Sequence, residues 1–370
     1  MTANVRGWGS AGAISGPPHK TEPEDLNECP SKIAIIKLSS LGDVIHALPV
    51  ARALRRGLRG VHLTWIVEAR EYALLKGHPD LDVVVPVDTR LWRRLIWRPA
   101  GARQVLGKVG RLRHRIRAAR FDVTLDLQGL VKSGLLTAYT GAPVRIGFTA
   151  DHCRERLNCL FTNRRVRPPA SAVHVVDQYL ALLAPLGIAP GPVEFHVPIP
   201  AAAERHMDEF LGEQGVKSRD LIVAINPGAG RDNKRWPVEH FRRLADRLGQ
   251  EPNVRILLLW GPDEVHMARQ IRDGLHARAI LAPPTDLHEL AGLLRRSALM
   301  VANDTGPLHL AAALGTPSLG LFGPTRAERN GPYGPHSRGV QSPDGTMASL
   351  DPQAAVDAAL ALLARRDPEP

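Results

Sequence analysis

The stretch KLSSLGDVIHALPV (residues 37–50) follows an apolar run and places two serines, a glycine and an aspartate where a strand gives way to a helix. A strand, a short polar loop and a helix in this order form the repeating unit of a parallel sheet. Short apolar runs alternate with helical patterns in the same way along most of the chain. The sequence therefore predicts an α/β fold.

This alternation starts twice, which predicts two Rossmann-like domains. The expected strands are residues 32–38, 62–68, 83–87, 122–127 and 144–148 in the first unit, and 221–226, 254–260, 298–303 and 318–322 in the second. A Pro-rich passage near residues 190–200 separates the two units. Ligands bind beyond the carboxyl ends of parallel strands, so two facing domains would form one deep cleft. The expected boundaries are a flexible lead (1–30), two domains (31–195 and 196–345) and a C-terminal helix that packs back on the first domain (346–370).

Composition excludes several classes of protein. No apolar run approaches the roughly 18 residues of a membrane-spanning helix, and the first 30 residues lack the apolar region of a signal peptide, so a cytoplasmic protein is expected. Three cysteines without metal-ligand spacing predict neither a disulfide framework nor a metal site. Neither unit has a dinucleotide or P-loop glycine motif after its first strand. We therefore expect no metal and no cofactor.

The motif VANDTGPLHLAAALGTP (301–317) predicts an anion site. Its strand ends at Asp304, Thr305 and Gly306 form a turn, and the following helix offers unpaired N–H groups to a phosphate. Gly306 permits close approach of the anion, and His309 in the first turn can donate to it. The alternative is that Asp304 and Thr305 only cap the helix.

A second motif, INPGAGRDNKRWP (225–237), also joins a strand to a helix. Gly228 and Gly230 permit a backbone cradle, and Lys234 supplies a charged amine for a diphosphate, unless it is a solvated surface lysine. Because both motifs lie at carboxyl ends of strands in one unit, a single diphosphate ligand can engage both. Glu264, beyond another strand, can accept hydrogen bonds from a ribose, or serve only as a first-turn helix carboxylate.

Asp43 has two interpretations, a helix cap or a general base. If Asp43 were the N-cap, Pro49 would be the sixth helical residue, where it loses a hydrogen bond and clashes with the preceding turn. A later helix start would leave the Asp43 carboxylate free to accept a proton from a hydroxyl. We therefore favour the base, although helices kinked at proline keep the cap as an alternative.

Eleven Lys and Arg lie between residues 90 and 120 without any Asp or Glu, which matches the whole net charge of +11. Residues 103–120 form an amphipathic helix with a basic face, typical of anion or membrane-surface binding or of a solvated face. Residues 88–98 are expected to form a loop that binds phosphate or carboxylate with Arg90, Arg93, Arg94 and Arg98, while Trp92 and Trp97 lie among lipid headgroups. No nucleic-acid-binding module accompanies these charges.

In combination, these motifs resemble the ADP-heptose glycosyltransferases of lipopolysaccharide inner-core assembly, nearest to the heptosyltransferase I branch. The resemblance covers nearly the whole chain after residue 31. The stretches that carry it are SSLGDVIHALP, WIVEAREYALLKGHPDLDVVVPVDTRLWRR, FDVTLDLQGLVKSGLL, HCRERLNCLFTNRRV, NKRWP and NDTGPLHLAAALG. The chain departs from the family before Lys234, where GAGRDN replaces threonines that can contact phosphate in close relatives.

The resemblance implies a GT-B fold and an inverting transfer of heptose from ADP-heptose to an anionic Kdo–lipid A type acceptor, at the inner face of the inner membrane. It implies that Asp43 is the catalytic base and that Lys234 holds the diphosphate. It also implies that the other residues of the donor and acceptor sites lie in the stretches quoted above. The implied donor site is Gly228, Gly230, Lys234, Glu264, Asp304, Thr305, Gly306 and His309, and the implied acceptor site is Ser40, Gly42, Arg90, Arg93, Arg94, Lys132 and Arg154. Alternatives are another GT-B enzyme, such as a heptosyltransferase II-like enzyme or an epimerase, and a non-catalytic ADP-binding scaffold at the membrane surface.

Overall fold

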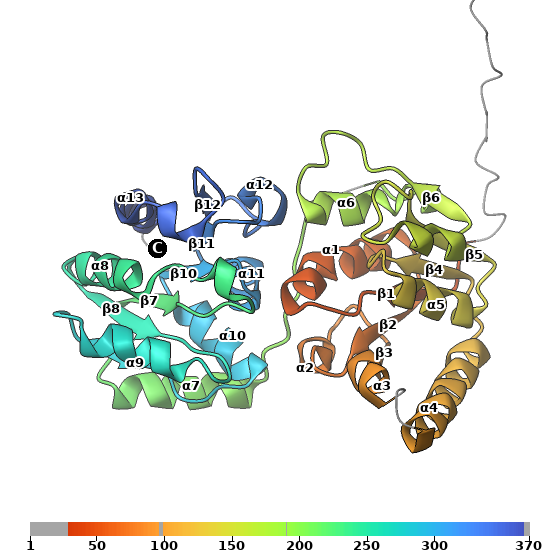
Figure 1. Ribbon diagram of the computed structural model, residues 1–370, viewed down its shortest axis with the longest axis horizontal. Coiled ribbons are helices and arrows are strands. Elements are labelled where there is room, and N and C mark those ends of the chain that lie inside the picture. The colour runs from red at the N-terminus through yellow and green to blue at the C-terminus, as the bar shows by residue number, and fades with distance from the viewer. Residues whose placement is uncertain (1–28, 96–98, 190, 366–370) are drawn as a thin grey trace, which may run out of the picture.

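The computed structural model describes residues 29–95, 99–189 and 191–365, which form two halves lying side by side (Figure 1). We call residues 29–189 the first half and residues 191–365 the second half. Each half contains one six-stranded parallel sheet with helices packed against it. The predicted α/β fold with two parallel sheets is therefore confirmed.

The two sheets have the same topology. The first sheet has the order β3-β2-β1-β4-β5-β6 and the second has β12-β11-β10-β7-β8-β9. The strands are β1 (Lys32–Ile36), β2 (His62–Glu68), β3 (Val83–Val87), β4 (Val123–Asp126), β5 (Val144–Phe148), β6 (Arg164–Val166), β7 (Leu221–Asn226), β8 (Val254–Leu258), β9 (Ala279–Leu281), β10 (Leu299–Asn303), β11 (Ser318–Phe322) and β12 (Ser337–Gln341). The strand order reverses beside β1 and β4 in one sheet and beside β7 and β10 in the other. Ligand sites of doubly wound sheets lie at these switch points.

Helices connect the strands on both sides of each sheet. The first half contains α1 (Leu41–Gly57), α2 (Tyr72–Leu75), α3 (Thr89–Leu95), α4 (Pro99–Ala118), α5 (Val131–Thr140) and α6 (Val175–Ala181), with the 3₁₀ helices η1 (Arg156–Phe161) and η2 (Ala184–Leu186). The second half contains α7 (Ala201–Glu213), α8 (Val238–Leu248), α9 (Val265–Asp273), α10 (Leu287–Arg296), α11 (Gly306–Ala313), α12 (Ala327–Asn330) and α13 (Pro352–Ala364), with η3 (Asp232–Lys234) and η4 (Met347–Ser349).

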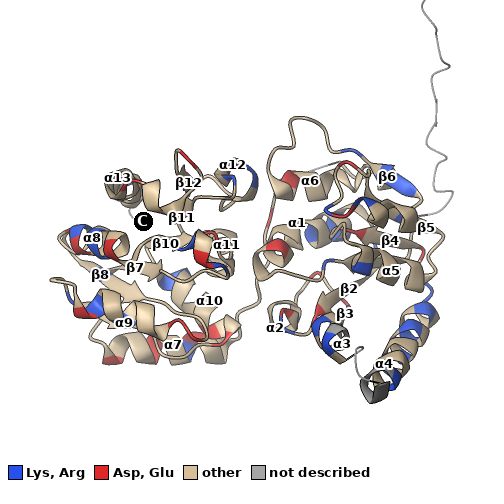
Figure 2. Cartoon of the chain, in the orientation of Figure 1, with Lys and Arg blue, Asp and Glu red and all other residues tan. Residues whose placement is uncertain are grey.

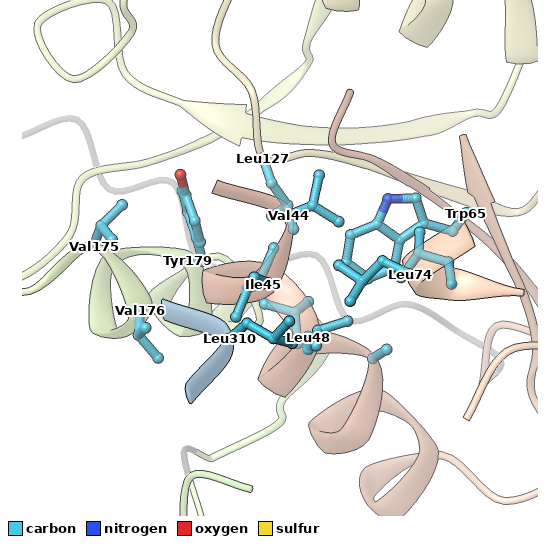
Figure 3. Packing of buried hydrophobic residues seen from close by; sticks show 14 of the residues in the cluster. Val44, Ile45, Leu48, Trp65, Leu74, Leu127, Val175, Val176, Tyr179 and Leu310 are labelled. Carbon is cyan, nitrogen blue, oxygen red and sulfur yellow. The ribbon is translucent and has the colours of Figure 1, made fainter. Parts of the chain in front are cut away.

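One apolar cluster crosses from the first half into the second. In Figure 3, Ile45 and Leu48 of α1 lie beside Leu310 of α11, and all three side chains are essentially inaccessible to solvent. Burying large aliphatic side chains in this way contributes roughly 1.5–3 kcal/mol each. The N-terminal part of α1 is therefore packed directly against the second half.

The C-terminal helix α13 packs against α8 and the strands β10 to β12, all in the second half. Ala355, Ala359 and Leu362 of this helix belong to the apolar cluster beneath that sheet. The expectation that the helix packs back on the first domain is therefore wrong, because its small and apolar face covers the second sheet next to α8 (Figure 1). The expected N-terminal lead lies almost entirely outside the described residues.

Candidate active site

Asp43 lies in the first turn of α1, immediately beyond β1. Ser40 is the N-cap residue, and its backbone N–H and hydroxyl donate to Asp43 Oδ2 at 3.0 and 2.9 Å. The expectation of a later helix start with a free carboxylate is therefore wrong. The Ser-x-x-Asp spacing forms a capping box that begins the helix before Asp43, and Pro49 lies inside the helix.

Two cations and a phenol surround the other oxygen of the same carboxylate. Arg154 donates to Asp43 Oδ1 at 2.7 Å, Lys37 Nζ lies 3.7 Å from that atom, and the Tyr179 hydroxyl donates to it at 3.4 Å. Burial raises the pKa of Asp43, but Lys37, Arg154 and the bonds from Ser40 outweigh it and hold the pKa below the usual aspartate range. The Asp43 carboxylate is therefore charged and accepts hydrogen bonds from Ser40 and Arg154.

Lys37 is the residue of this site that the sequence analysis did not assign. It directly follows β1, its side chain is inaccessible to solvent, and its ammonium donates to Tyr179 Oη at 2.6 Å and to the Leu127 carbonyl beyond β4 at 3.0 Å. Burial lowers the pKa of Lys37 to about 8, although Asp43 acts in the opposite direction. A single lysine in an apolar stretch gives no sequence signal of this burial.

The donor motifs meet at the carboxyl ends of β7 and β10. Asp304 Oδ2 accepts from Lys234 Nζ at 2.6 Å and from the Thr325 hydroxyl at 2.8 Å, and Asp304 Oδ1 is 3.2 Å from His309 Nε2. Burial raises the pKa of Asp304, but the contacts with His309 and Lys234 outweigh it and hold the pKa below the ordinary value. Lys234 is thus fixed above the start of α11 and is not a freely solvated lysine.

The start of α11 presents polar atoms that are not satisfied by the protein. Thr305 Oγ1 and His309 Nδ1 are buried and have no hydrogen-bond partner among the described residues. Thr305 is the N-cap of α11, so the first N–H groups of the helix lie beside its hydroxyl. These donors, together with Lys234, suit a phosphate or diphosphate group.

A buried asparagine fixes the second donor loop, and the sequence analysis did not assign it. Asn303 donates to the carbonyls of Pro227 and Gly228 at 2.8 and 3.1 Å and accepts from Trp236 N at 3.1 Å. Gly228 lies directly against the Glu264 carboxylate, where a Cβ would overlap it. The structure therefore brings Gly228 and Glu264 together.

Not every residue predicted to bind the sugar donor contacts the others. Gly230 is exposed, and a Cβ there would meet no atom within 4 Å, so close packing by the protein does not require glycine at this position. Glu264 accepts a hydrogen bond from Gly261 N at 3.2 Å, and one of its oxygens lies 3.9 Å from Arg235. Glu264 is the N-cap residue of α9, but its side chain makes no capping hydrogen bond to that helix.

The predicted acceptor cations are distributed over several elements. Arg90 and Arg94 are exposed on α3, which is a helix, so the expectation of a loop is wrong for residues 89–95. The apolar side of this turn, including Trp92, packs on the sheet, which favours the helix over an open loop. Trp97, Arg98 and the side chain of Arg93 lie outside the described residues. Lys132 at the start of α5 is 3.3 Å from Glu68.

The two sites face each other where α1 meets α11. A Cβ on Gly42 would lie 2.6 Å from the His309 ring, and a Cβ on Gly306 would lie 2.6 Å from Leu41. The His309 ring is also 4.3 Å from the ring of His46 in α1. Asp43, which follows Gly42, is thus brought close to the start of α11 by glycine contacts between the two helices.

Two cavities are lined by residues at α12 and not by α1 or α11. One of about 260 Å³ lies between the halves and is lined by His152, Gln178 and Arg329, among others. Another, of about 740 Å³, includes Thr325, which bonds Asp304. Among the described residues, no cluster of three or more His, Cys, Asp or Glu is arranged to hold a metal ion, and none of the described helices is long and apolar enough to cross a membrane.

Comparison with known proteins identifies similar enzymes. The model of glycosyltransferase family 9 (heptosyltransferase) matches residues 109–359. A lipopolysaccharide heptosyltransferase 1 from Pseudomonas aeruginosa is 34% identical over 313 residues, covering 82% of this chain and 81% of that protein. Lipopolysaccharide heptosyltransferase 1 from Escherichia coli K12 is 30% identical over 328 residues, covering 88% and 98%.

Solved structures share the fold. The E. coli heptosyltransferase WaaC with ADP has a TM-score of 0.74 and 28% identity, covering 90% of this chain and 99% of that one. A family 9 glycosyl transferase from Veillonella parvula has a TM-score of 0.79 at 23% identity, covering 91% and 98%, which supports the fold alone. The paired sheets are those of the GT-B heptosyltransferase structures, as the resemblance implied.

Proposed function

The chain belongs to glycosyltransferase family 9, the heptosyltransferases, and on this premise we propose that it transfers heptose from ADP-heptose to a Kdo–lipid A type acceptor in lipopolysaccharide inner-core synthesis. The observation that carries the proposal is the position of Asp43 directly across the α1–α11 contact from Lys234, Asp304 and Thr305. One carboxylate and one anion site, held by different halves, suit a reaction that joins two substrates.

In the proposed mechanism, the ADP-heptose diphosphate binds Lys234, the Thr305 hydroxyl and the N–H groups at Gly306. His309 and Asp304 position these groups, the loop at Gly228 and Gly230 lies along the diphosphate, and Glu264 takes the ribose. Negative charge grows on the diphosphate as the glycosidic bond breaks, so these donors stabilise the transition state more than the bound substrate. No step requires a metal ion.

Asp43 accepts the proton of the acceptor hydroxyl while the hydroxyl oxygen attacks the anomeric carbon and ADP leaves with the bonding electrons. This displacement inverts the anomeric configuration. Its cation partners make Asp43 a weak base in the free protein. An anionic acceptor that binds Arg154 would draw this cation from Asp43 and raise the proton affinity of the carboxylate when it is needed.

Residues 31–195, which include nearly all of the first half, are proposed to bind the acceptor. Residues 196–345 of the second half are proposed to bind the nucleotide sugar. Arg154, Lys132 and the α3 arginines Arg90, Arg93 and Arg94 are proposed to receive the anionic groups of the acceptor, with Ser40 and Gly42 forming the loop beside its hydroxyl. Basic residues on α3, coloured blue in Figure 2, support a peripheral location at the inner face of the inner membrane.

The decisive experiment incubates the protein with ADP-heptose and a Kdo-bearing lipid A acceptor and measures the product mass. A mass increase of one heptose is expected, and UDP- and GDP-sugars should give no product. Transfer from one of those sugars, or epimerisation without transfer, would identify a different GT-B enzyme. Tight ADP binding without any turnover would instead identify a non-catalytic scaffold.

Asp43→Asn tests the assignment of the base with nearly unchanged side-chain volume. Transfer should fall by at least about a hundredfold, the range of general-base catalysis, while ADP binding persists. Asp273→Asn is the matched control, because Asp273 is exposed on α9 and contacts only Arg272 among the bonds described. An unchanged transfer rate in Asp43→Asn would contradict the assignment.

A further inference from the structure

Two leucines of η1 are among the most exposed large apolar side chains of the described protein. Leu157 and Leu160 are 64% and 70% exposed. They lie three residues apart in a 3₁₀ helix, where side chains at positions i and i+3 lie one above the other. The two leucines therefore form one outward-facing apolar pair.

The opposite side of η1 holds the helix firmly to the fold. Asn158 is inaccessible to solvent and donates to Asp126 at 2.7 Å and to the Leu130 carbonyl at 2.8 Å. Phe161 packs directly against Gly134 of α5, where a Cβ would overlap its ring. Because Asn158 and Phe161 hold the helix in place, Leu157 and Leu160 cannot turn inward without breaking these contacts.

Arginines flank the leucine pair along the chain. Residues 151–167 contain five arginines against two acidic residues, and strand β6 of this segment is coloured blue in Figure 2. One acid, Glu155, accepts from Val131 N at 2.6 Å, and the other, Asp151, pairs with Arg167 at 2.7 Å. Apolar side chains among arginines are typical of surfaces that bind anionic lipid headgroups.

We propose that η1, with the arginines of residues 154–167, docks on an anionic lipid bilayer and inserts Leu157 and Leu160 at the boundary between headgroups and acyl chains. This inference rests on the proposed function, because it assumes a lipid-borne acceptor. Two leucines are too few for a stable protein interface, which buries about 800 Å² on each partner. A bilayer requires only a small apolar pair with a basic surround.

The surface is joined to the catalytic carboxylate by a short segment. Arg154, two residues before η1, donates to Asp43 at 2.7 Å. Docking of η1 would therefore hold the acceptor side of Asp43 near the bilayer surface, where the sugar of a glycolipid projects. The docking surface is thus linked to the reaction centre through Arg154.

Vesicle flotation tests the proposal with the full-length protein. Leu157→Gln/Leu160→Gln should bind vesicles containing phosphatidylglycerol at least tenfold more weakly than the parent, and the parent should bind pure phosphatidylcholine weakly. Leu106→Gln is the matched control, because Leu106 is 67% exposed on α4, apart from η1. Unchanged ADP affinity in the double variant would show that its fold is intact.

Activity assays separate this proposal from the proposed function. The double variant should match the parent on a deacylated, water-soluble acceptor and be slower on acceptor embedded in vesicles. Equal flotation of the double variant and the parent would overturn the docking surface, even with full transfer activity. Loss of flotation in Leu106→Gln alone would also overturn it, because α4 would then be the contact. Failure of transfer with every acceptor would refute the proposed function, but the flotation result would still test membrane docking by η1.

Discussion

Asp43 and Lys37 form a buried ion pair whose two members depend on each other. The carboxylate keeps its charge because Lys37 and Arg154 outweigh its burial, and the lysine has a pKa lowered to about 8 because burial outweighs the carboxylate. Removing one member of such a pair leaves an uncompensated charge on the other. The pair therefore fixes the basicity of the proposed catalytic group.

Lys37→Met should move the acid limb of kcat/KM to higher pH by roughly one to three pH units, because a neighbouring cation depresses the pKa of a carboxylate by about that amount. The measurement is the pH profile of kcat/KM between pH 3 and 7, because the depressed pKa of Asp43 places the acid limb of the parent below the ordinary aspartate range. Tyr179→Phe keeps the ammonium and removes only the hydroxyl, so its profile should shift less. An unshifted limb in Lys37→Met, with transfer merely slower, would mean that Lys37 acts only as a structural residue.

Lys234→Met should weaken ADP binding by about ten- to a hundredfold, since a charge-assisted hydrogen bond contributes roughly 1.5–3 kcal/mol. Titration calorimetry with ADP measures the change. Lys217→Met is the matched control, because Lys217 is exposed in the same half, and the contact described for it is made by its backbone. Equal ADP affinity in both variants would remove Lys234 from the diphosphate site.

At this scale, the sequence predicted local turns better than contacts between residues that are distant in sequence. The turn at Thr305 and Gly306 was predicted correctly because a local pattern determines a helix start. Lys37 and Asn303 were not assigned, because their partners lie far away in sequence, at Tyr179 and Pro227. Asp43 was predicted to precede the helix because Pro49 favoured a later helix start, whereas the Ser-x-x-Asp capping spacing determines the start.

At the scale of elements, α1 and α11 meet through glycines at their N-termini. Gly42→Ala should separate them, because its Cβ would lie 2.6 Å from the His309 ring, which is buried and held by Asp304. Overpacking of this kind costs about 1–3 kcal/mol, so the free energy of unfolding should fall by that amount and transfer should slow at least tenfold. Denaturant unfolding and steady-state kinetics measure the two effects.

Gly110→Ala is the control for this substitution. Gly110 lies inside α4, and a Cβ there would meet no atom within 4 Å. Alanine should therefore stabilise the helix, by up to about 1 kcal/mol, and leave transfer unchanged. If Gly42→Ala behaved like Gly110→Ala, the close approach of α1 and α11 would not matter for the reaction.

Apolar periodicity predicted several strands to the residue, for example β2, β7 and the edge strand β3. The strands it missed, β6, β9 and β12, lie at sheet edges, are short or largely exposed, and lack a buried apolar run. Helix α3 was mistaken for a loop because its arginines conceal an apolar side that only tertiary packing reveals. Burial thus decided which elements the sequence could predict.

At the scale of the whole molecule, sequence predicted two sheets but not how the halves attach. The position of α13 depended on which sheet offered an apolar groove, and no local pattern encodes that choice. The contact between the halves is likewise made by residues distant in sequence. It contains three histidines: His46 lies 4.3 Å from His309 of the second half and 5.2 Å from His174, measured between ring centroids.

This histidine contact predicts a loss of stability in mild acid. Burial lowers the pKa of His46 well below its ordinary value, and the neighbouring histidines lower it further, while Asp43 acts in the opposite direction. Burial also lowers the pKa of His174, opposed by its bond to the Gly331 carbonyl and by Asp177. An unfolded histidine binds its proton near pH 6.5. Below that pH the unfolded chain therefore binds protons that these histidines do not bind in the folded protein.

The free energy of unfolding should therefore decrease as the pH falls from about 6.5 toward the lower pKa values of the folded state. The carboxyls of Asp43 and Asp304, whose folded pKa values are depressed, lose their contribution only below about pH 4, so they do not explain a change between pH 5 and 6.5.

His46→Phe keeps a ring in the contact but cannot titrate. Its thermal midpoint should vary less between pH 5 and 7 than that of the parent, whereas His266→Phe, on the exposed side of α9, should match the parent. The same pH slope in His46→Phe as in the parent would place the acid sensitivity outside the contact between the halves.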